Sequence, residues 1–167
     1  MKKITKIIAS AVAALALFVT VDANAQNSRK FGIGLNVGAG TGTGQSFAIG
    51  GDLRYQLDVA KQLSIPITAG YTNIQYKDGY GDISYGYIPV KAGLKYFFND
   101  SGAGAYGLAE AGAAFAVGDF SGTNFVYSPA IGYSWSNGLD LAAKYEGVSN
   151  GGSTGYVGLR LAYGFKL

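Results

Sequence analysis

The sequence predicts an all-β protein: an eight-stranded antiparallel up-and-down transmembrane β-barrel that follows a cleaved signal peptide. Three observations support this fold class. Eight runs of residues alternate between apolar and small or polar side chains, which is the two-residue period of a β-strand. Short turns join the runs, as in a meander of hairpins. Charged residues form only 14% of the chain, against about 25% in typical soluble domains.

Residues 1–25 have the three parts of a secretory signal peptide. The opening MKKITK carries three lysines, the run 7–21 is largely apolar, and Ala23–Ala25 is a small-x-small cleavage site. A membrane anchor is the alternative, but the apolar run is shorter than the ~20 residues that a spanning helix needs. We therefore expect a signal peptide at 1–25 and a single outer-membrane-type barrel domain at 26–167.

The predicted strands are the alternating runs 31–40, 47–58, 63–75, 85–98, 103–117, 124–135, 139–148 and 156–167. The run 103–117 is rich in alanine, which favours helices, but its glycines and its flanking strands favour a strand. The alternation is lost at the end of the third run, around 72–76, where we expect a β-bulge. Strands of this length can cross a bilayer at a tilt of roughly 45°.

The two faces of each predicted strand differ in a way that a soluble sheet does not explain. In the last run, one face carries Val157, Leu159, Leu161, Tyr163, Phe165 and Leu167, and the other is mostly glycine and alanine. The wet face of a soluble sheet would carry many Thr, Lys and Glu residues instead. We therefore expect the apolar face to point outward to lipid, while small residues fill the narrow bore of a closed barrel. A secreted soluble β-protein is the alternative.

Two turns predict how the strands pair. If Asp100 and Ser101 are the two loop residues between the fourth and fifth runs, Lys91 lies opposite Glu110. The turn at 136–138 pairs residues of the sixth and seventh runs whose numbers sum to 274. Both registers keep the apolar residues of paired strands on one face, although the faces were assigned from the alternation alone.

Charged residues on the inner face are the candidate site. The predicted lumen network consists of Asp52, Arg54, Lys91, Lys95, Glu110, Asp140, Lys144, Glu146 and Arg160, and Asp58 and Lys166 are also expected to point inward. Acids and bases are nearly balanced, and a buried charge without a partner costs several kcal/mol. We expect a structural lattice of ion pairs, with Lys91 paired to Glu110 and Arg160 close to Glu146 or Asp140. A narrow gated ion path is the alternative.

Aromatic residues recur at one end of the predicted barrel. They lie on the outer face where the even-numbered runs finish: Tyr55, Tyr96, Phe98, Tyr133, Trp135, Tyr163 and Phe165. Such rings form the aromatic girdles of membrane interfaces. The general preference of strands for aromatic residues explains their presence but not their common position.

The ending AYGFKL resembles the C-terminal assembly signal of outer-membrane proteins, with Leu167 in place of the usual final Phe. The whole chain after the signal peptide resembles the small eight-stranded outer-membrane barrels of the OmpA-barrel and OmpX-like group. The stretch YIPVKAGLKYFF (87–98) resembles the barrel-domain pattern of Bacteroidota. This resemblance implies an integral outer-membrane protein of a Gram-negative bacterium. The expected partners are outer-membrane lipid, lipopolysaccharide and the outer-membrane assembly machinery, with the barrel itself a monomer.

The chemistry of known enzymatic sites is weak or missing. The chain has no histidine, so the histidine-dependent mechanisms of barrel deacylases, phospholipases and omptin proteases do not transfer. The stretch GAGTGTG (38–44) lacks the Lys-Ser/Thr ending of a phosphate loop. The loop DGYGD (78–82) offers two carboxylates to calcium, but solvated carboxylates are commoner. We expect no enzyme, no cofactor and no catalytic or metal-binding residue.

Function follows from these expectations only in outline. Without the signal peptide the formal charge is +1, which gives no electrostatic reason to bind nucleic acid. We expect a structural, envelope-integrity or surface-contact role with a side-chain-filled lumen. The alternative is a narrow channel or carrier for small ions or small apolar molecules.

Overall fold

The computed structural model describes residues 29–77, 84–118, 121–149 and 153–167. The predicted signal peptide and the loop 78–82 lie outside these ranges, so the domain boundary and the calcium alternative stay predictions. Within the described ranges, no helix is long and apolar enough to cross a membrane.

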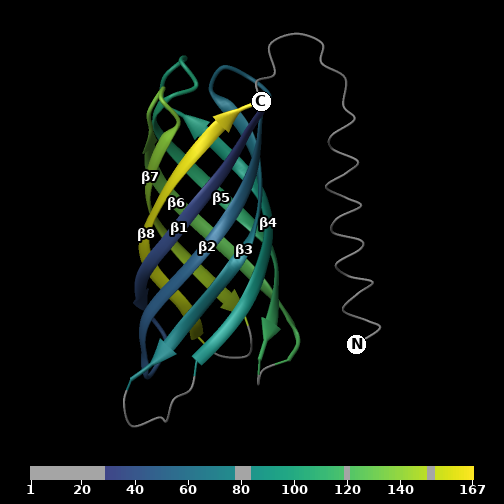
Figure 1. Cartoon of the computed structure of the whole chain (residues 1–167), viewed down its shortest axis with the longest axis vertical. Helices are drawn as coiled ribbons and strands as arrows, with labels where there is room; N and C mark the ends of the chain where they lie inside the picture. Colours follow the sequence, from purple (N-terminus) through teal and green to yellow (C-terminus); the bar gives the residue numbers. More distant parts are fainter. Residues whose placement is uncertain (1–28, 78–83, 119–120, 150–152) are drawn as a thin grey trace.

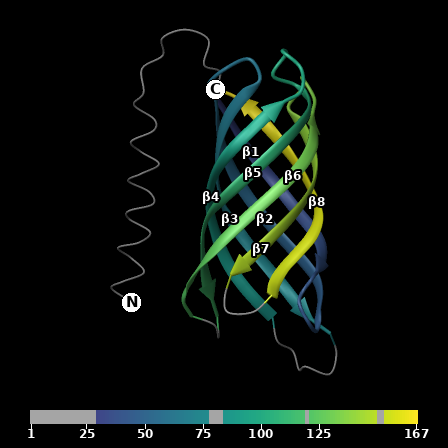
Figure 2. The same cartoon turned by 180° about the vertical axis from the view of Figure 1, so that it is seen from behind.

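The described chain forms a closed barrel of eight antiparallel strands, and this confirms the predicted fold class (Figures 1 and 2). The strands are β1 (Arg29–Gly40), β2 (Gln45–Asp58), β3 (Leu63–Tyr76), β4 (Ser84–Phe97), β5 (Gly104–Val117), β6 (Thr123–Ser134), β7 (Leu139–Ser149) and β8 (Ser153–Lys166). Each strand pairs with its sequence neighbours, and β8 closes on β1. The alanine-rich run is a strand, because its outward alanines and inward larger residues follow the strand period.

We call the end of the barrel where β1 begins and β8 ends the terminal end, and the opposite end the distal end. The strands are strongly tilted to the barrel axis (Figure 1). The tilt also appears in the pairing around the barrel. A path of paired residues that starts at Phe31 in β1 arrives, after all eight strands, at Thr41, the residue after β1, whose N–H donates to the carbonyl of Gly155. Eight tilted strands enclose a bore that only side chains can fill.

The predicted bulge lies on the neighbouring strand. The register of β2 and β3 shifts between Gln45 and Ala48, opposite Tyr76 and Ile74, so the extra residue belongs to β2. Strand β3 keeps its two-residue period to the end. Its pattern looked irregular because Ile74, an apolar residue, points into the lumen and is 0% exposed.

One of the two predicted registers is right and the other is shifted. Ser134 pairs with Asp140, as the sum of 274 requires. Between β4 and β5, however, Gly93 pairs with Glu110, whereas Lys91 pairs with Gly112. The turn is therefore centred one residue later than expected, and Gly102 and Gly104, with φ of 65° and 105°, supply its left-handed backbone. The shift is by two residues along the partner strand, so every side chain keeps its predicted face.

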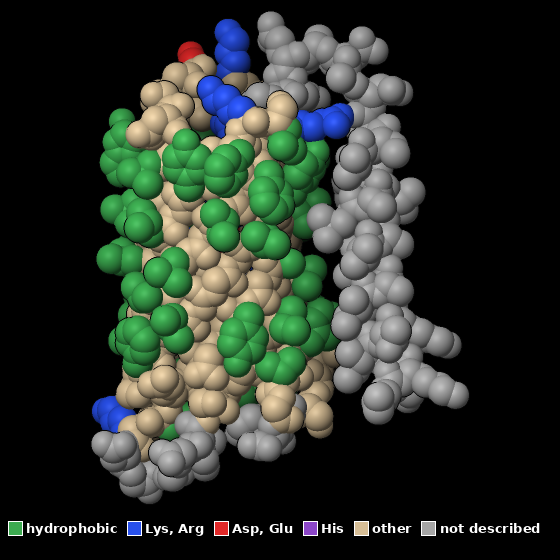
Figure 3. All heavy atoms as spheres, viewed as in Figure 1, with side chains coloured by type: hydrophobic (Ala, Val, Ile, Leu, Met, Phe, Trp, Pro, Cys, Tyr) green, Lys and Arg blue, Asp and Glu red, His purple; other side chains and the backbone are tan. Residues whose placement is uncertain are grey.

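The outer surface is apolar and the inner one is not. In β8, Leu159 and Leu161 are 52% and 51% exposed, while Arg160 between them is 3% exposed. Figure 3 shows large hydrophobic side chains in two bands, one near each end of the barrel. This arrangement is the reverse of a soluble β-protein, where such side chains would be buried.

The seven predicted girdle residues lie on the outer face near the terminal end. Six of their rings pack in three pairs, with centroids 6.2 Å apart for Tyr96 and Phe98, 4.8 Å for Tyr133 and Trp135, and 4.9 Å for Tyr163 and Phe165. A second band near the distal end was not predicted. It includes the exposed residues Phe47, Phe125 and Tyr127.

A substitution at Gly112, an inner-face glycine in close contact with the neighbouring strand, tests the fold. A Cβ at Gly112 would overlap the carbonyl oxygen of Val90, a backbone atom of the paired strand β4. We expect Gly112→Ala to lower the free energy of unfolding in lipid vesicles by about 1–3 kcal/mol, because a backbone neighbour cannot move aside cheaply. Gly51→Ala is the matched control, since Gly51 lies on the outer face with its nearest neighbour 3.7 Å away. Equal effects of the two substitutions would contradict the inner placement of Gly112.

Candidate functional site

The lumen network is the candidate site, and the structure brings all nine of its predicted residues together. Each one is less than 9% exposed, and they come from β2, β4, β5, β7 and β8. No ionisable residue comes from β6, whose inner face is small or apolar at Val126, Ser128, Ala130 and Gly132. These small residues leave room for the long side chains of the other strands.

Asp52 is held by a two-pronged contact with Arg160. Arg160 donates through Nη2 at 2.6 Å and through Nε at 2.9 Å, so each carboxylate oxygen receives a hydrogen bond. Asn36 Nδ2 adds a third donor at 2.7 Å. The guanidinium lies over Gly34, where a Cβ would be only 2.7 Å from Nη2. Glycine at that position therefore makes room for the planar, bidentate ion pair.

Glu110, on β5, accepts hydrogen bonds from β2 and β3, neither of which pairs with β5. Arg54 Nη2 donates at 3.1 Å and the Thr68 hydroxyl at 2.6 Å. Lys91 Nζ, the partner predicted from the register, lies 4.0 Å away. The predicted pair is thus present but long, because Lys91 is two positions out of direct register with Glu110.

The shorter of the two ion pairs of Lys91 is with Glu146, which lies across the bore on β7. Lys144 Nζ contacts the same carboxylate oxygen, Oε2, at 2.9 Å, and the Tyr87 hydroxyl donates to Oε1 at 2.8 Å. Register arguments connect only neighbouring strands, so a contact between β4 and β7 could not be predicted that way.

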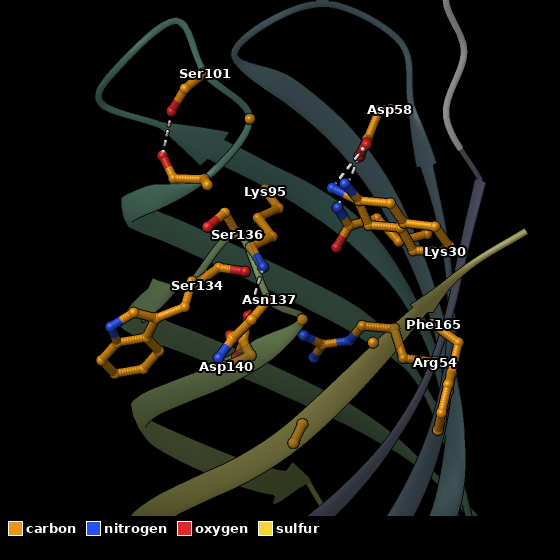
Figure 4. A pocket seen from close by; sticks show the side chains of 18 of the residues that line it. Lys30, Arg54, Asp58, Lys95, Ser101, Ser134, Ser136, Asn137, Asp140 and Phe165 are labelled. Atoms are coloured by element: carbon orange, nitrogen blue, oxygen red, sulfur yellow. Dashed lines mark hydrogen bonds and ion pairs between the residues drawn. The ribbon is translucent and has the colours of Figure 1, made fainter.

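Among the carboxylates of the lumen network, Asp140 lies nearest the terminal end. Lys95 Nζ and the Tyr106 hydroxyl each contact it at 2.7 Å, and Arg160 Nη1 lies 3.6 Å away. Figure 4 shows Lys95 and Asp140 facing each other within a cavity. The prediction that Arg160 lies near Glu146 or Asp140 agrees with this distance, but its principal partner, Asp52, was not identified.

The four carboxylates belong to one continuous network. Lys144 Nζ donates to Asn36 Oδ1 at 3.5 Å, and Asn36 links this side of the bore to Asp52. Arg160 then connects Asp52 to Asp140. Sequence reasoning missed Thr68, Tyr87 and Tyr106 as partners of the acids, although each occupies an inward position. Every acid thus has at least two donors, which offsets the cost of removing it from water.

A cluster of buried side chains, which we call the distal plug, occupies the distal part of the lumen. It consists of Ala48, Ile74, Tyr85, Tyr87, Ala114, Val126, Val148 and Tyr156, all at most 4% exposed. The expectation of a small and charged inner face fails in this part, which is apolar and aromatic, and also at a second buried cluster of Phe97, Tyr106, Leu108 and Ala142. Within the described residues, the Ser128 Oγ and the Tyr156 hydroxyl are buried without a hydrogen-bond partner.

The two remaining charged residues expected to point inward lie at the terminal rim. Asp58 pairs with Lys30 at 2.9 Å, a partner that was not predicted. Lys166 is exposed, because it is the last residue of β8 and its side chain reaches solvent. In the described ranges, no group of three or more His, Cys, Asp or Glu side chains is placed to hold a metal ion.

Several solved structures with a similar architecture are outer-membrane proteins or designed transmembrane barrels. They include the outer-membrane protein Ail of Yersinia pestis in a phospholipid nanodisc, with a TM-score of 0.61, 16% identity, and 84% of this chain and 100% of that chain covered. For the N-terminal β-barrel domain of Pseudomonas aeruginosa OprF, the TM-score is 0.59 at 17% identity, with 84% of this chain and 100% of that chain covered. For the de novo designed protein TMB2.3, the TM-score is 0.55 at 18% identity, with 84% of this chain and 97% of that chain covered.

No protein-family model and no curated protein sequence matches the chain. The structural similarities establish the fold: the chain has the architecture of the small eight-stranded outer-membrane barrels, the group that its sequence resembles. The resemblance of residues 87–98 to barrel domains of Bacteroidota stays a prediction.

The network predicts how the energies of its members couple. Lys91→Met should destabilise the barrel by about 3–5 kcal/mol, because Glu146 and Glu110 keep their charges in a buried site. Adding Glu146→Gln should recover more of this loss than adding Glu110→Gln, since Glu146 makes the shorter contact. Double-mutant cycles on the free energy of unfolding in vesicles measure both couplings. Additive losses in the Glu146 cycle would contradict the observed pairing.

Proposed function

We propose that the protein is an integral outer-membrane barrel with a structural role in the envelope and a lumen closed to solutes. The observation that carries this proposal is the inversion of the barrel, with an apolar exterior around a paired, charged interior. Contiguous exposed apolar surface on this scale marks a membrane or protein interaction site. A closed barrel also leaves no unpaired strand edge in lipid. These features argue against the secreted soluble alternative.

The contents of the bore favour a structural role over transport. The distal plug fills one end with large side chains, and the lumen network fills the middle. Neither contains a histidine or a cysteine, and the network residues are engaged with one another. We therefore propose no catalytic role. The proposed surroundings are outer-membrane lipid and lipopolysaccharide, reached through the assembly machinery, with the barrel a monomer.

Trp135, the single tryptophan, reports whether the terminal aromatic band lies at a membrane interface. It is 40% exposed on the outer surface, beside Tyr133. In vesicles of lipids brominated at different depths, we expect strongest quenching of Trp135 by the shallowest bromines. The matched control is Leu161→Trp in a Trp135→Phe background, which places the probe nearer the middle of the exterior and should be quenched by deep bromines. Absence of quenching at every depth would contradict membrane insertion.

Conductance distinguishes the closed barrel from the channel alternative. Planar bilayers that contain the folded barrel should show no current steps above those of lipid alone, because the distal plug closes the bore. Tyr87→Ala with Tyr156→Ala removes two of its largest side chains and should produce small steps. Heat-modifiable gel mobility verifies that both samples are folded. Discrete steps from the unmodified barrel would overturn the closed-lumen proposal and favour the narrow channel.

A further inference from the structure

The terminal end contains a cavity that the closed-barrel role does not require. Its volume is about 770 Å³, and it is lined by inner-face residues of β2, β4, β7 and β8 and by the turns at this end. We call it the vestibule. Figure 4 shows the Lys30–Asp58 pair at its rim and Lys95 with Asp140 in its interior. Cavities of this volume hold small organic molecules in many proteins.

The buried charges of the lumen do not balance. Among the described residues that are less than 9% exposed, the cations are Arg54, Lys91, Lys95, Lys144 and Arg160. The buried carboxylates are Asp52, Glu110, Asp140 and Glu146. One buried positive charge therefore lacks a fixed counter-charge. Such a charge is costly unless an anion or water compensates it.

Cations also outnumber carboxylates among the residues that line the vestibule. The cations that line it are Lys30, Arg54, Lys61, Lys95, Arg160 and Lys166. The carboxylates that line it are Asp58, Asp100 and Asp140. Lys61 and Lys166 make no ion pair within the described ranges. Basic side chains also gather at the terminal end in Figure 3. A cavity with cationic walls concentrates anions, because low-dielectric surroundings focus the field.

Lys95 is built into the inner part of the vestibule. Its Nζ lies 3.8 Å from the centroid of the Tyr106 ring and 4.9 Å from that of Phe97, and the side chain is only 2% exposed. Its one ion-pair partner in the described chain is Asp140, which Tyr106 and Arg160 also contact. The ammonium group of Lys95 therefore lies between one carboxylate and two aromatic rings at the inner end of the vestibule.

We propose that the vestibule binds an oxyanion, the phosphate group of a small solute or of a lipid headgroup, between Lys95 and the other cations that line it. The site opens at the terminal end among the turns that include Lys61, Ser101 and Asn137. The bound anion adds negative charge to a cavity in which cations outnumber carboxylates. Binding there goes beyond the structural role and needs no open path through the distal plug.

Calorimetric titration of the folded barrel with inorganic phosphate tests the proposal. In maltoside micelles, which contain no phosphate, we expect saturable binding of about one phosphate per barrel. Lys95→Gln should weaken binding roughly tenfold or more, because it removes a buried cation that lines the site. Lys61→Gln with Lys166→Gln alters only the rim, leaves the lumen intact, and should weaken binding roughly threefold.

Lys77→Gln is the matched control, because Lys77 is an exposed lysine beyond the distal end of β3 and should leave phosphate binding unchanged. If Lys95→Gln does not fold, the rim pair of substitutions decides. No saturable binding by the folded barrel would overturn the proposal, and so would an equal loss in Lys77→Gln and the rim variant. Heat-modifiable gel mobility of the same samples shows whether the barrel is folded. A folded barrel that does not bind phosphate would contradict the binding site alone and not the barrel assignment.

The source of the phosphate is resolved by repeating the titration in nanodiscs that contain phosphatidylglycerol. Weaker phosphate binding than in micelles would show that a headgroup occupies the site. Equal binding in both would show that this headgroup does not compete for the site and would favour a soluble phosphate as the ligand. Both results support an oxyanion site in the vestibule.

Discussion

The narrow bore of an eight-stranded closed barrel is the constraint on which the structure depends. Each inward position must be filled by a side chain that is small, apolar or paired, because little room remains for water. Gly34 illustrates this: the guanidinium of Arg160 occupies the space that a side chain there would need. The interior therefore combines large side chains with small residues such as Gly34, and each acid of the lumen network has several donors.

The exterior follows from the same alternation of side chains. A strand that turns a charged or small residue inward turns the next residue outward, and here the outward set is apolar on every strand. Burial of that set in a core would place Arg160 and Glu146 on the outside and break the network. The inverted arrangement is consistent only with an apolar environment around the barrel.

The alternation predicted the eight strands, their faces and the inward position of all nine network residues, because these depend on the two-residue period alone. It did not predict contacts across the bore, such as Lys91 with Glu146, since these depend on tilt and closure. The turn before β5 was misplaced by one residue, because Gly102 and Gly104 allow a left-handed backbone that the sequence does not position. The distal plug was missed because inward apolar residues such as Ile74 interrupt the pattern.

We infer that successive residues of each strand point in turn outward to lipid and inward to a packed lumen. The chain has no cysteine, so single cysteines at each position from 157 to 165 can carry a spin label in vesicles. Oxygen, which dissolves in lipid, should reach labels at the odd positions, while labels at the even positions should be inaccessible to it and immobile. Free access of a water-soluble nickel complex to the odd positions, with no oxygen contact, would contradict the account.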